Sequence, residues 1–221
     1  MKVAAFYDVH GMSWVLEAVL AEVGDADVVL FGGDLLNGPD PARTVELARA
    51  TGGVFVRGNC EREPKEWDRV QLTDDDLSWL AALPLTASID GVLYCHATPD
   101  DDMPITTVFT PDELIAERFG GHDERVFVIG HTHHQFDRRV GGIRVVNAGS
   151  VGMPYEDDVA AYWLAVEDGE PSFRRTEFDV ERAVAELRHS GWPQAERFVA
   201  ENLLVPASRA EAVAFFEAQN G

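Results

Sequence analysis

The sequence predicts an α/β protein built from two sheets that pack face to face with helices outside them. Strand and helix patterns alternate over residues 2–56, and this alternation is typical of a parallel sheet covered by helices. Hairpin signals dominate residues 85–177, which indicates a second set of strands that run antiparallel. The chain has 221 residues, enough for one domain with a sizeable core.

The first half of the chain contains three short apolar runs and two amphipathic segments. The runs predict strands at Lys2–Tyr7, Asp27–Phe31 and Val54–Val56. Ser13 is placed to cap a first helix, whose apolar residues recur at helical spacing (Val15, Leu16, Val19, Leu20 and Val23). Asp40 and Pro41 are expected to begin a second helix, and a pair of glycines at 52–53 to end it.

The second half contains a short helix, three hairpins and a helical end. Thr73 and Asp76 form a capping box before the short helix. The hairpins are expected at Leu85–Ile89 with Val92–His96, Arg138–Val140 with Ile143–Asn147, and Ala160–Glu167 with Ser172–Glu177. The final helices are expected at Val180–Ser190, Pro193–Leu204 and Ser208–Gln219. We therefore expect a domain over 1–178 and a helical extension over 179–221 packed on it.

The charge balance restricts the partners. The chain has 39 acidic and 18 basic residues, a net charge of −21, which disfavours extended nucleic acid and anionic membranes. A small phosphorylated substrate remains compatible if local cations outweigh this field. Cys60 and Cys95 are too few for a disulfide framework, and no signal peptide or bilayer-spanning run is present, so a cytoplasmic protein is expected.

Carboxylate, amide and imidazole side chains follow the predicted strands directly. The apolar run at 126–129 is followed by Gly130, which lets the chain turn and come close to its neighbours, and then by His131 and His133. In extended backbone this spacing turns both imidazoles to one side. Ligands of sheet-based folds gather at the carboxyl ends of strands. One site is therefore expected from the residues at these ends: Asp8, His10, Asp34, Asn59, His96, His131 and His133.

This set of donor atoms predicts two divalent metal ions. Oxygen and imidazole ligands without thiolates suit manganese, iron, zinc, nickel or cobalt. Two such cations roughly 3.5–4 Å apart need a shared ligand, for which a carboxylate is suited. The pair lowers the pKa of a bridging water and yields hydroxide near neutral pH.

The order Asp-x-His, Gly-Asp, Gly-Asn-x-Glu, His and Gly-His-x-His resembles the calcineurin-like metallophosphoesterases, most closely their small prokaryotic phosphodiesterase branch. The resemblance covers about Lys2–Val151, and residues 147–152 resemble that branch's loop after the last metal motif. It implies a four-layer α/β/β/α sandwich of two mixed sheets with the dinuclear site at the strand ends. By similarity, the first metal would be held by Asp8, His10, Asp34 and His133. The second would be held by Asp34, as the bridge, with Asn59, His96 and His131.

The resemblance implies a metal-dependent phosphoric ester hydrolase, in which a metal-bridging hydroxide attacks phosphorus in line while Asn59 and His96 position the phosphate. Cys60 stands where phosphatases of the protein-phosphatase type carry histidine. A cysteine protonates an alkoxide less well than imidazolium does near neutral pH, so diesters with good leaving groups are the expected substrates. Two alternatives are a phosphomonoesterase acting on nucleotides or small phosphates, and a non-catalytic protein-interaction scaffold of the same fold.

Several further residues have two interpretations each. Glu61 is expected to orient the Asn59 loop or to be a surface charge, and Arg57 to contact a phosphate oxygen or to be an ordinary surface base. The acidic run 100–102, in the long loop Ala97–Pro111, would rim the site or be solvated. His134 is expected to support the site or to be exposed. Apolar positions of the C-terminal helices would cover the sheet or form a homodimer interface.

Overall fold

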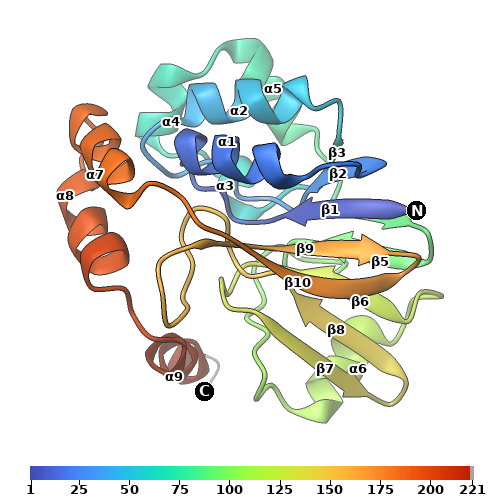
Figure 1. The fold of residues 1–221 in the computed structure, drawn as a ribbon. Helices are drawn as coiled ribbons and strands as arrows, with labels where there is room; N and C mark the ends of the chain where they lie inside the picture. Colours follow the sequence, from blue (N-terminus) through green and yellow to red (C-terminus); the bar gives the residue numbers. More distant parts are fainter. Residues whose placement is uncertain (220–221) are drawn as a thin grey trace.

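Two five-stranded mixed sheets form the centre of the molecule (Figure 1). The computed structural model describes residues 1–219, so the last two residues of the predicted extension lie outside the described part. The first sheet has the spatial order β10 (Glu170–Thr176), β9 (Ala161–Glu167), β1 (Lys2–Phe6), β2 (Val28–Phe31) and β3 (Val54–Phe55). The second has the order β4 (Thr86–Ile89), β5 (Val92–Cys95), β6 (Val126–Ile129), β8 (Ile143–Asn147) and β7 (Phe136–Val140). The predicted strands are confirmed to within two residues at their ends.

Helices lie on the outer faces of both sheets, which confirms the four-layer α/β/β/α arrangement (Figure 1). The helices before the second sheet are α1 (Ser13–Glu22), α2 (Pro41–Ala50), α3 (Asn59–Arg62), α4 (Glu66–Gln71) and α5 (Asp74–Ala81). The later ones are α6 (Asp112–Phe119), α7 (Val180–His189), α8 (Ala195–Phe198), the π-helix η1 (Val199–Leu204) and α9 (Arg209–Gln219). None of the helices within residues 1–219 has the length and hydropathy needed to cross a membrane.

The alternation of side chains in β1 shows why the layers are separate. Phe6 points outward into the apolar core beneath α1 and α2, whereas Ala5 points into the core between the two sheets, where Tyr7 also lies. Tyr7 crosses that inner core, since its hydroxyl donates to the backbone oxygen of Val128 in β6 at 2.9 Å. A third core beneath α6 contains Phe119 and Phe127. The inner core therefore fixes the first sheet against the second.

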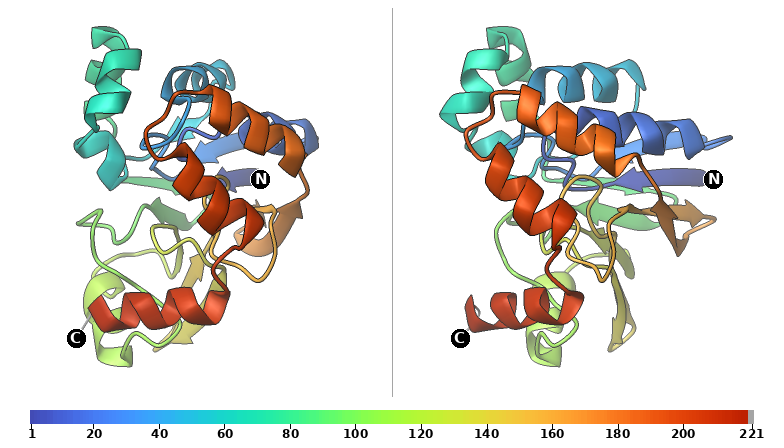
Figure 2. Two further views of the ribbon diagram at one scale, coloured as in Figure 1. Left: turned by 90° about the vertical axis from the view of Figure 1, so that its left-hand side faces the viewer. Right: turned by 60° about the vertical axis from the view of Figure 1, so that its left-hand side comes forward.

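The C-terminal helices pack along the edge at which the strands end (Figures 1 and 2). Leu187 of α7 and Phe198 of α8 are buried in the core that covers the first sheet. Figure 2 shows that the chain then continues past the second sheet to α9. The last segment thus contacts the body of the molecule, while the division at residue 178 stays a prediction.

The structure corrects the predicted start of the first helix. Ser13 is not the cap: Met12 occupies that position, and no side-chain oxygen caps α1. Ser13 Oγ instead donates to Asp40 Oδ2 at 2.6 Å, while Asp40 Oδ1 accepts from the backbone of Arg43 at the start of α2. The Ser13 hydroxyl therefore ties α1 to α2, and local sequence spacing does not indicate this partner.

The third hairpin turn also differs from the prediction, because β10 begins at Glu170 rather than at residue 172.

Candidate metal centre

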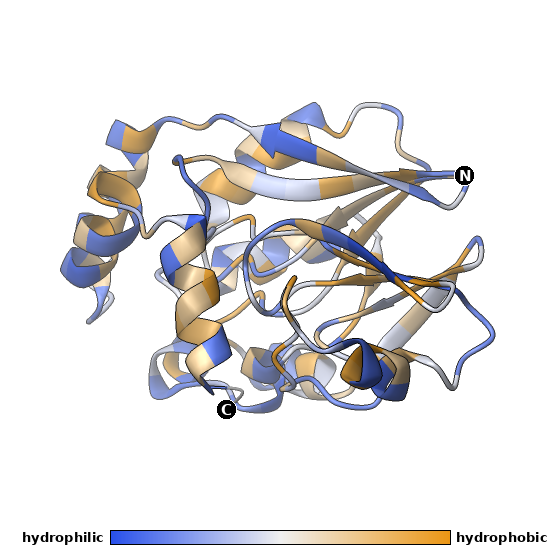
Figure 3. Ribbon diagram, turned by 90° about the horizontal axis from the view of Figure 1, so that it is seen from below, coloured by the Kyte–Doolittle hydropathy of each residue, from blue (hydrophilic) through white to orange (hydrophobic). Residues whose placement is uncertain are grey.

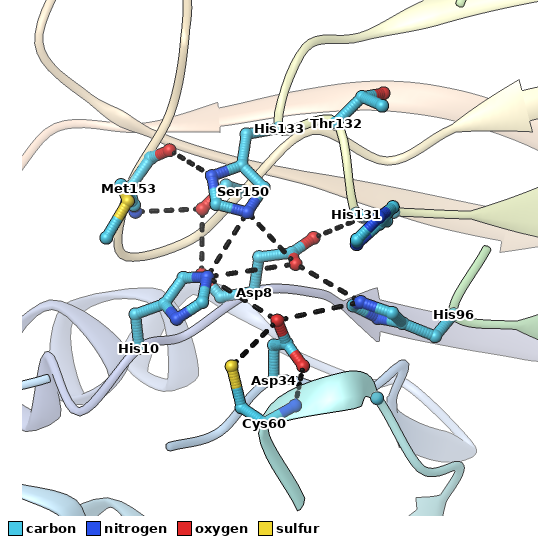
Figure 4. Close-up of polar contacts among 12 residues, drawn as sticks. Asp8, His10, Asp34, Cys60, His96, His131, Thr132, His133, Ser150 and Met153 are labelled. Atoms are coloured by element: carbon cyan, nitrogen blue, oxygen red, sulfur yellow. Dashed lines mark hydrogen bonds and ion pairs between the residues drawn. The ribbon is translucent and has the colours of Figure 1, made fainter. Parts of the chain in front are cut away.

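All the strand-end residues predicted to form one site lie at the same edge of the two sheets. Asp8 follows β1, Asp34 follows β2, His96 follows β5, and the two histidines at 131 and 133 follow β6 (Figure 4). Asp8 is 0% exposed, His96 1% and Asp34 2%. Unpaired carboxylates are costly to bury, so these acidic groups require a positive partner.

The backbone conformation at these residues differs from the extended one that the sequence pattern suggested. Asp8, His10, Asp34, His131 and His133 all have φ between 47° and 66°, in the left-handed region. The expectation that His131 and His133 point to one side in extended backbone is therefore wrong, and their rings meet different partners. Each such residue costs of order 1–3 kcal/mol, and such strain concentrates at functional sites.

Gly130 brings this turn close to the first sheet. A Cβ atom at Gly130 would lie 2.5 Å from Asp8 Oδ2 and 2.5 Å from Tyr7 Cδ1. Its φ lies outside the left-handed region, so the glycine is required for close approach rather than for a sharp turn.

We expect Gly130→Ala to weaken metal binding by about 10- to 100-fold, because the added methyl would displace the Asp8 carboxylate from its neighbours. Titration of the variant with Mn²⁺ in a calorimeter measures this. Gly121→Ala is the matched control, since a Cβ there meets nothing within 4 Å. Equal affinities for the two variants would contradict the prediction.

Backbone carbonyl oxygens fix the proton on each imidazole of the site. The Nδ1 atom of His10 lies 3.0 Å from the Leu36 oxygen, that of His133 lies 2.7 Å from the Met153 oxygen, and that of His96 lies 3.0 Å from the Gly32 oxygen. A carbonyl oxygen only accepts, so Nδ1 carries the proton and the Nε2 lone pair is left for another partner. Such outer hydrogen bonds are the usual supports of metal-ligating histidines.

The freed lone pairs converge with carboxylate oxygens. His10 Nε2 lies 3.2 Å from His133 Nε2, and the latter is 3.2 Å from Asp8 Oδ1, an atom without a hydrogen-bond donor (Figure 4). Asp34 Oδ2 lies 3.9 Å from His10 Nε2 on the same side. The unprotonated Nε2 atoms and the carboxylate oxygens all present lone pairs, so they repel one another, and a cation between them removes this repulsion. The donor set fits a divalent metal of the imidazole-and-oxygen type.

A second group of acceptor atoms lies around the same two carboxylates, Asp8 and Asp34. His96 Nε2 lies 3.6 Å from Asp34 Oδ2, 3.9 Å from Asp8 Oδ1 and 3.1 Å from Asn59 Oδ1. The ring of His131 packs against the ring of His96, with centroids 5.0 Å apart. However, His131 Nε2 faces the Met103 oxygen at 3.0 Å, so only its Nδ1 carries an available lone pair. Among the described residues, three buried groups can hold a metal: Asp8 with His10 and His133, His10 with Asp34 and Cys60, and Asp8 with Asp34 and His96.

The electrostatics at this edge favour a cation. Burial opposes ionisation of Asp8, but the imidazoles of His133, His96 and His10 hold its pKa well below the usual range. Burial likewise opposes protonation of His96, yet the carboxylates of Asp34 and Asp8 raise its pKa overall. The pKa of His131 falls to about 4 because of burial, so its ring is neutral near pH 7. A divalent ion would replace the proton that the two carboxylates attract.

Glu61 and Cys60 support the Asp34 loop from beneath. Glu61 is buried and accepts hydrogen bonds from the backbone nitrogens of Asp34, Leu35 and Gly58 at 2.7–2.8 Å, so it orients this loop and is no surface charge. Burial and the charge of Asp34 raise the Glu61 pKa to about 7. Cys60 donates its backbone N–H and its thiol to Asp34, at 2.9 and 3.1 Å. Burial raises the pKa of this thiol well above its usual value, which keeps it protonated.

Arg57 is paired within the protein. Its Nε lies 3.4 Å from Asp102 Oδ2, and Arg62 Nε lies 3.1 Å from Asp102 Oδ1. Asp102 is 2% exposed, so the expectation that the acidic run is solvated is wrong at this residue. The pair ties loop 97–111 to the Asn59 loop, next to Met103, whose oxygen holds His131. The sequence carried no signal for this pairing.

The comparisons with known proteins agree with this geometry. The model of the calcineurin-like phosphoesterase superfamily domain matches residues 1–169. The chain belongs to this superfamily. The resemblance seen in the order of the metal motifs is therefore confirmed at the family level, and the family implies a phosphoester hydrolase that binds divalent metals.

Solved structures of the phosphoesterase fold are similar over most of the chain. A metallophosphoesterase from Sphaerobacter thermophilus is 25% identical, with a TM-score of 0.73 over 88% of this chain and 96% of that one. A hypothetical protein from Pyrococcus horikoshii OT3 is 15% identical, with a TM-score of 0.72 over 91% and 98%. A protein serine/threonine phosphatase from Saccharomyces cerevisiae is 14% identical, with a TM-score of 0.52 over 81% and 80%. The last two show the fold alone. No curated protein sequence matches this phosphoesterase.

Two further residues contribute to the phosphoesterase site. Ser150 Oγ donates to the backbone oxygen of Asp8 at 2.7 Å and accepts from the nitrogen of Met153, so it joins the loop after β8 to the first metal motif. His134 is 1% exposed, and its Nδ1 donates to the Thr132 oxygen at 2.8 Å. It therefore supports the turn after β6 and is not exposed. The contact of Ser150 with Asp8 joins distant segments of the chain, so local sequence spacing does not indicate it.

Proposed function

We propose that this phosphoesterase is a dinuclear metal-dependent phosphodiesterase. The observation that supports the proposal is the convergence of imidazole and carboxylate lone pairs in two sets that share Asp34. Asp8, His10, Asp34 and His133 would hold one metal ion, and Asp34, Asn59, His96 and the Nδ1 atom of His131 the other. When bound, the two cations would withdraw charge from the phosphate oxygens and supply an activated water as nucleophile.

Asn59 and His96 would position the phosphate. His96 directly follows β5, and Asn59 is the first residue of α3, where its side chain is partly exposed at a cavity of about 330 Å³ whose wall includes His10, Asp34 and Cys60. Asn59 Nδ2 donates one hydrogen to Cys60 Sγ at 3.5 Å, which orients the amide so that its other N–H can meet a phosphate oxygen from the cavity. The site thus provides orientation as well as charge.

The chemistry of Cys60 supports diesters as substrates. Its thiol lies at the cavity, keeps its proton and donates to Asp34, so it is engaged in holding a carboxylate. A leaving alkoxide would therefore receive little help from this position, whereas an aryl or other acidic leaving group departs without protonation. The alternative, a phosphomonoesterase on the same site, requires a proton donor elsewhere. Cytoplasmic location, manganese as the metal and a homodimer stay predictions.

The test is hydrolysis by metal-stripped protein after adding back Mn²⁺, Ni²⁺, Zn²⁺, Fe²⁺ or Mg²⁺ one at a time. We expect at least one metal to restore turnover, with a larger kcat/KM for bis(4-nitrophenyl) phosphate than for 4-nitrophenyl phosphate. The binding metal should also stabilise the fold, by about 2.7 kcal/mol at a concentration 100 times its Kd. A larger kcat/KM for the monoester would favour the phosphomonoesterase. Absence of any bound metal would favour the scaffold.

A further inference from the structure

An apolar cavity of about 610 Å³ adjoins the metal centre on the side of α9. Its wall includes Tyr155, Val205, Phe215 and Phe216. Tyr155, Phe215 and Phe216 also line the cavity at the metal centre, so the two spaces adjoin at these rings. Ligand sites of roughly 300–1,000 Å³ with mainly apolar walls hold groups the size of a ring system and its substituents.

Helix α9 is fixed in place by contacts that leave Phe215 at the cavity. Glu217 accepts from Thr107 Oγ1 at 2.5 Å, and Arg209 Nε donates to the buried Glu156 at 2.7 Å. Phe216 packs near Tyr155, with centroids 6.1 Å apart. Figure 3 shows that α9 carries hydrophobic residues over much of its length. The helix therefore presents a wall of aromatic rings to the site.

Phe215 and Val205 are exposed to an extent unusual for large apolar side chains, at 63% and 75%. Tyr155 lies between them and the metal centre, since its ring stacks on that of His133 with centroids 5.0 Å apart and an interplanar angle of 18°. Exposed apolar groups next to a polar centre mark a binding surface. A planar ring adjacent to the phosphate would extend these ring contacts, of which His133 with Tyr155 is stacked and Tyr155 with Phe216 is tilted by 51°.

The charges around the apolar cavity select the kind of ring. Glu201 and Glu211 line it, and among its lining residues in the described part of the chain there is no lysine or arginine. Glu201 Oε2 accepts from Arg197 Nε at 2.9 Å, and Glu211 Oε2 accepts from Ser208 Oγ at 2.7 Å. A neutral ring with N–H groups could donate to the Oε1 atoms of these carboxylates, whereas a second phosphate would meet no lysine or arginine among the lining residues. The surface thus fits a heterocycle such as a nucleobase.

We propose that this apolar cavity is the subsite for a neutral aromatic group of the substrate, with Phe215 as the residue that determines specificity. The proposal rests on the proposed function, because it places the phosphate of the same ester at the metal centre. It narrows the substrate class to phosphoesters that carry one planar ring with N–H donors and a single phosphate.

The first experiment compares phenylphosphonate with methylphosphonate, which share the charged group and differ in the ring. Calorimetric titration of the metal-loaded protein is expected to show about fivefold to tenfold tighter binding of phenylphosphonate. This ratio should approach one in Phe215→Ala and be retained in Phe215→Tyr. The matched control is Phe109→Ala, which removes a ring that is 68% exposed but does not line either cavity. A ratio of one in the wild type, or an equal loss in both alanine variants, would overturn the proposal.

The second experiment needs neither metal nor turnover. Adenosine and ribose are titrated into metal-free protein, and NMR shifts of the Phe215 region are followed. We expect saturable binding of adenosine, abolished in Phe215→Ala, and none of ribose. No difference between the two probes overturns the subsite even if the enzyme is an active phosphodiesterase. Adenosine binding without ester hydrolysis would support the subsite while the proposed function fails.

A second copy of the chain is the competing occupant of the cavity. Sedimentation of wild type and Phe215→Ala distinguishes it from a small ring. The proposal expects the same mass for both proteins. A dimer that dissociates in Phe215→Ala would show that a neighbouring subunit covers this surface, and would overturn the subsite.

Discussion

Asp34→Asn is expected to lower metal-restored phosphoesterase activity by more than ~100-fold. Changing a residue that only hydrogen-bonds to a metal ligand costs about 10- to 100-fold, and loss of a ligand itself should cost more. The carboxylate of Asp34 takes part in both convergent sets of acceptors, at 3.9 Å from His10 Nε2 and 3.6 Å from His96 Nε2. An amide offers one neutral oxygen in place of two charged ones, so it cannot serve both sets. Steady-state hydrolysis of an aryl diester, together with the metal content of the variant, measures the effect.

The control for this substitution is Asp123→Asn. It removes the same charge at an exposed position away from the site, so its kcat/KM and its two-metal content should equal those of the wild type. If Asp34→Asn retained both metal ions and full turnover, the bridging role would be refuted. If it lost one ion and most activity, the assignment of Asp34 as the shared ligand would be supported.

Glu61→Ala should have the largest effect on stability. The change leaves the backbone nitrogens of Asp34, Leu35 and Gly58 without their acceptor in a buried site. Each unsatisfied buried group costs about 1–3 kcal/mol, so the free energy of unfolding should fall by about 3–6 kcal/mol. Urea unfolding of metal-free protein measures this without interference from metal binding.

Glu63→Ala is the matched control. The Glu63 side chain is 68% exposed, and its carboxylate forms a surface ion pair with Arg62 Nη1 at 3.5 Å. Surface ion pairs contribute about 0–1 kcal/mol, so little change is expected. Glu61→Gln should lie between the two variants, since it keeps one acceptor oxygen and adds a donor that finds no acceptor at these nitrogens. A Glu61→Ala protein as stable as the control would show that water replaces the carboxylate.

The sequence by itself determined which side chains meet and where. Asp8, Asp34, His96 and His131 each follow an apolar run that forms a strand, and strands that share an edge bring their ends together. Rules based on neighbouring residues were sufficient to place these strands, because apolar runs and tight turns depend on residues close together in the chain. The turn at Asp90-Gly91, where both residues have positive φ, is an example. Helix α6 was missed since, among its eight residues, only Ile115 and Phe119 are buried.

Only the tertiary structure decided how those side chains are oriented. The carbonyl oxygens that hold the imidazoles come from distant segments: Leu36 for His10, Gly32 for His96, and Met103 for His131. The same is true of the aromatic wall of α9, which lies about sixty residues beyond Tyr155 in the chain and beside it in space. Hydrogen bonds and ring contacts between distant segments leave no periodic pattern in the sequence, and they fix the strained left-handed backbone that aims the ligands.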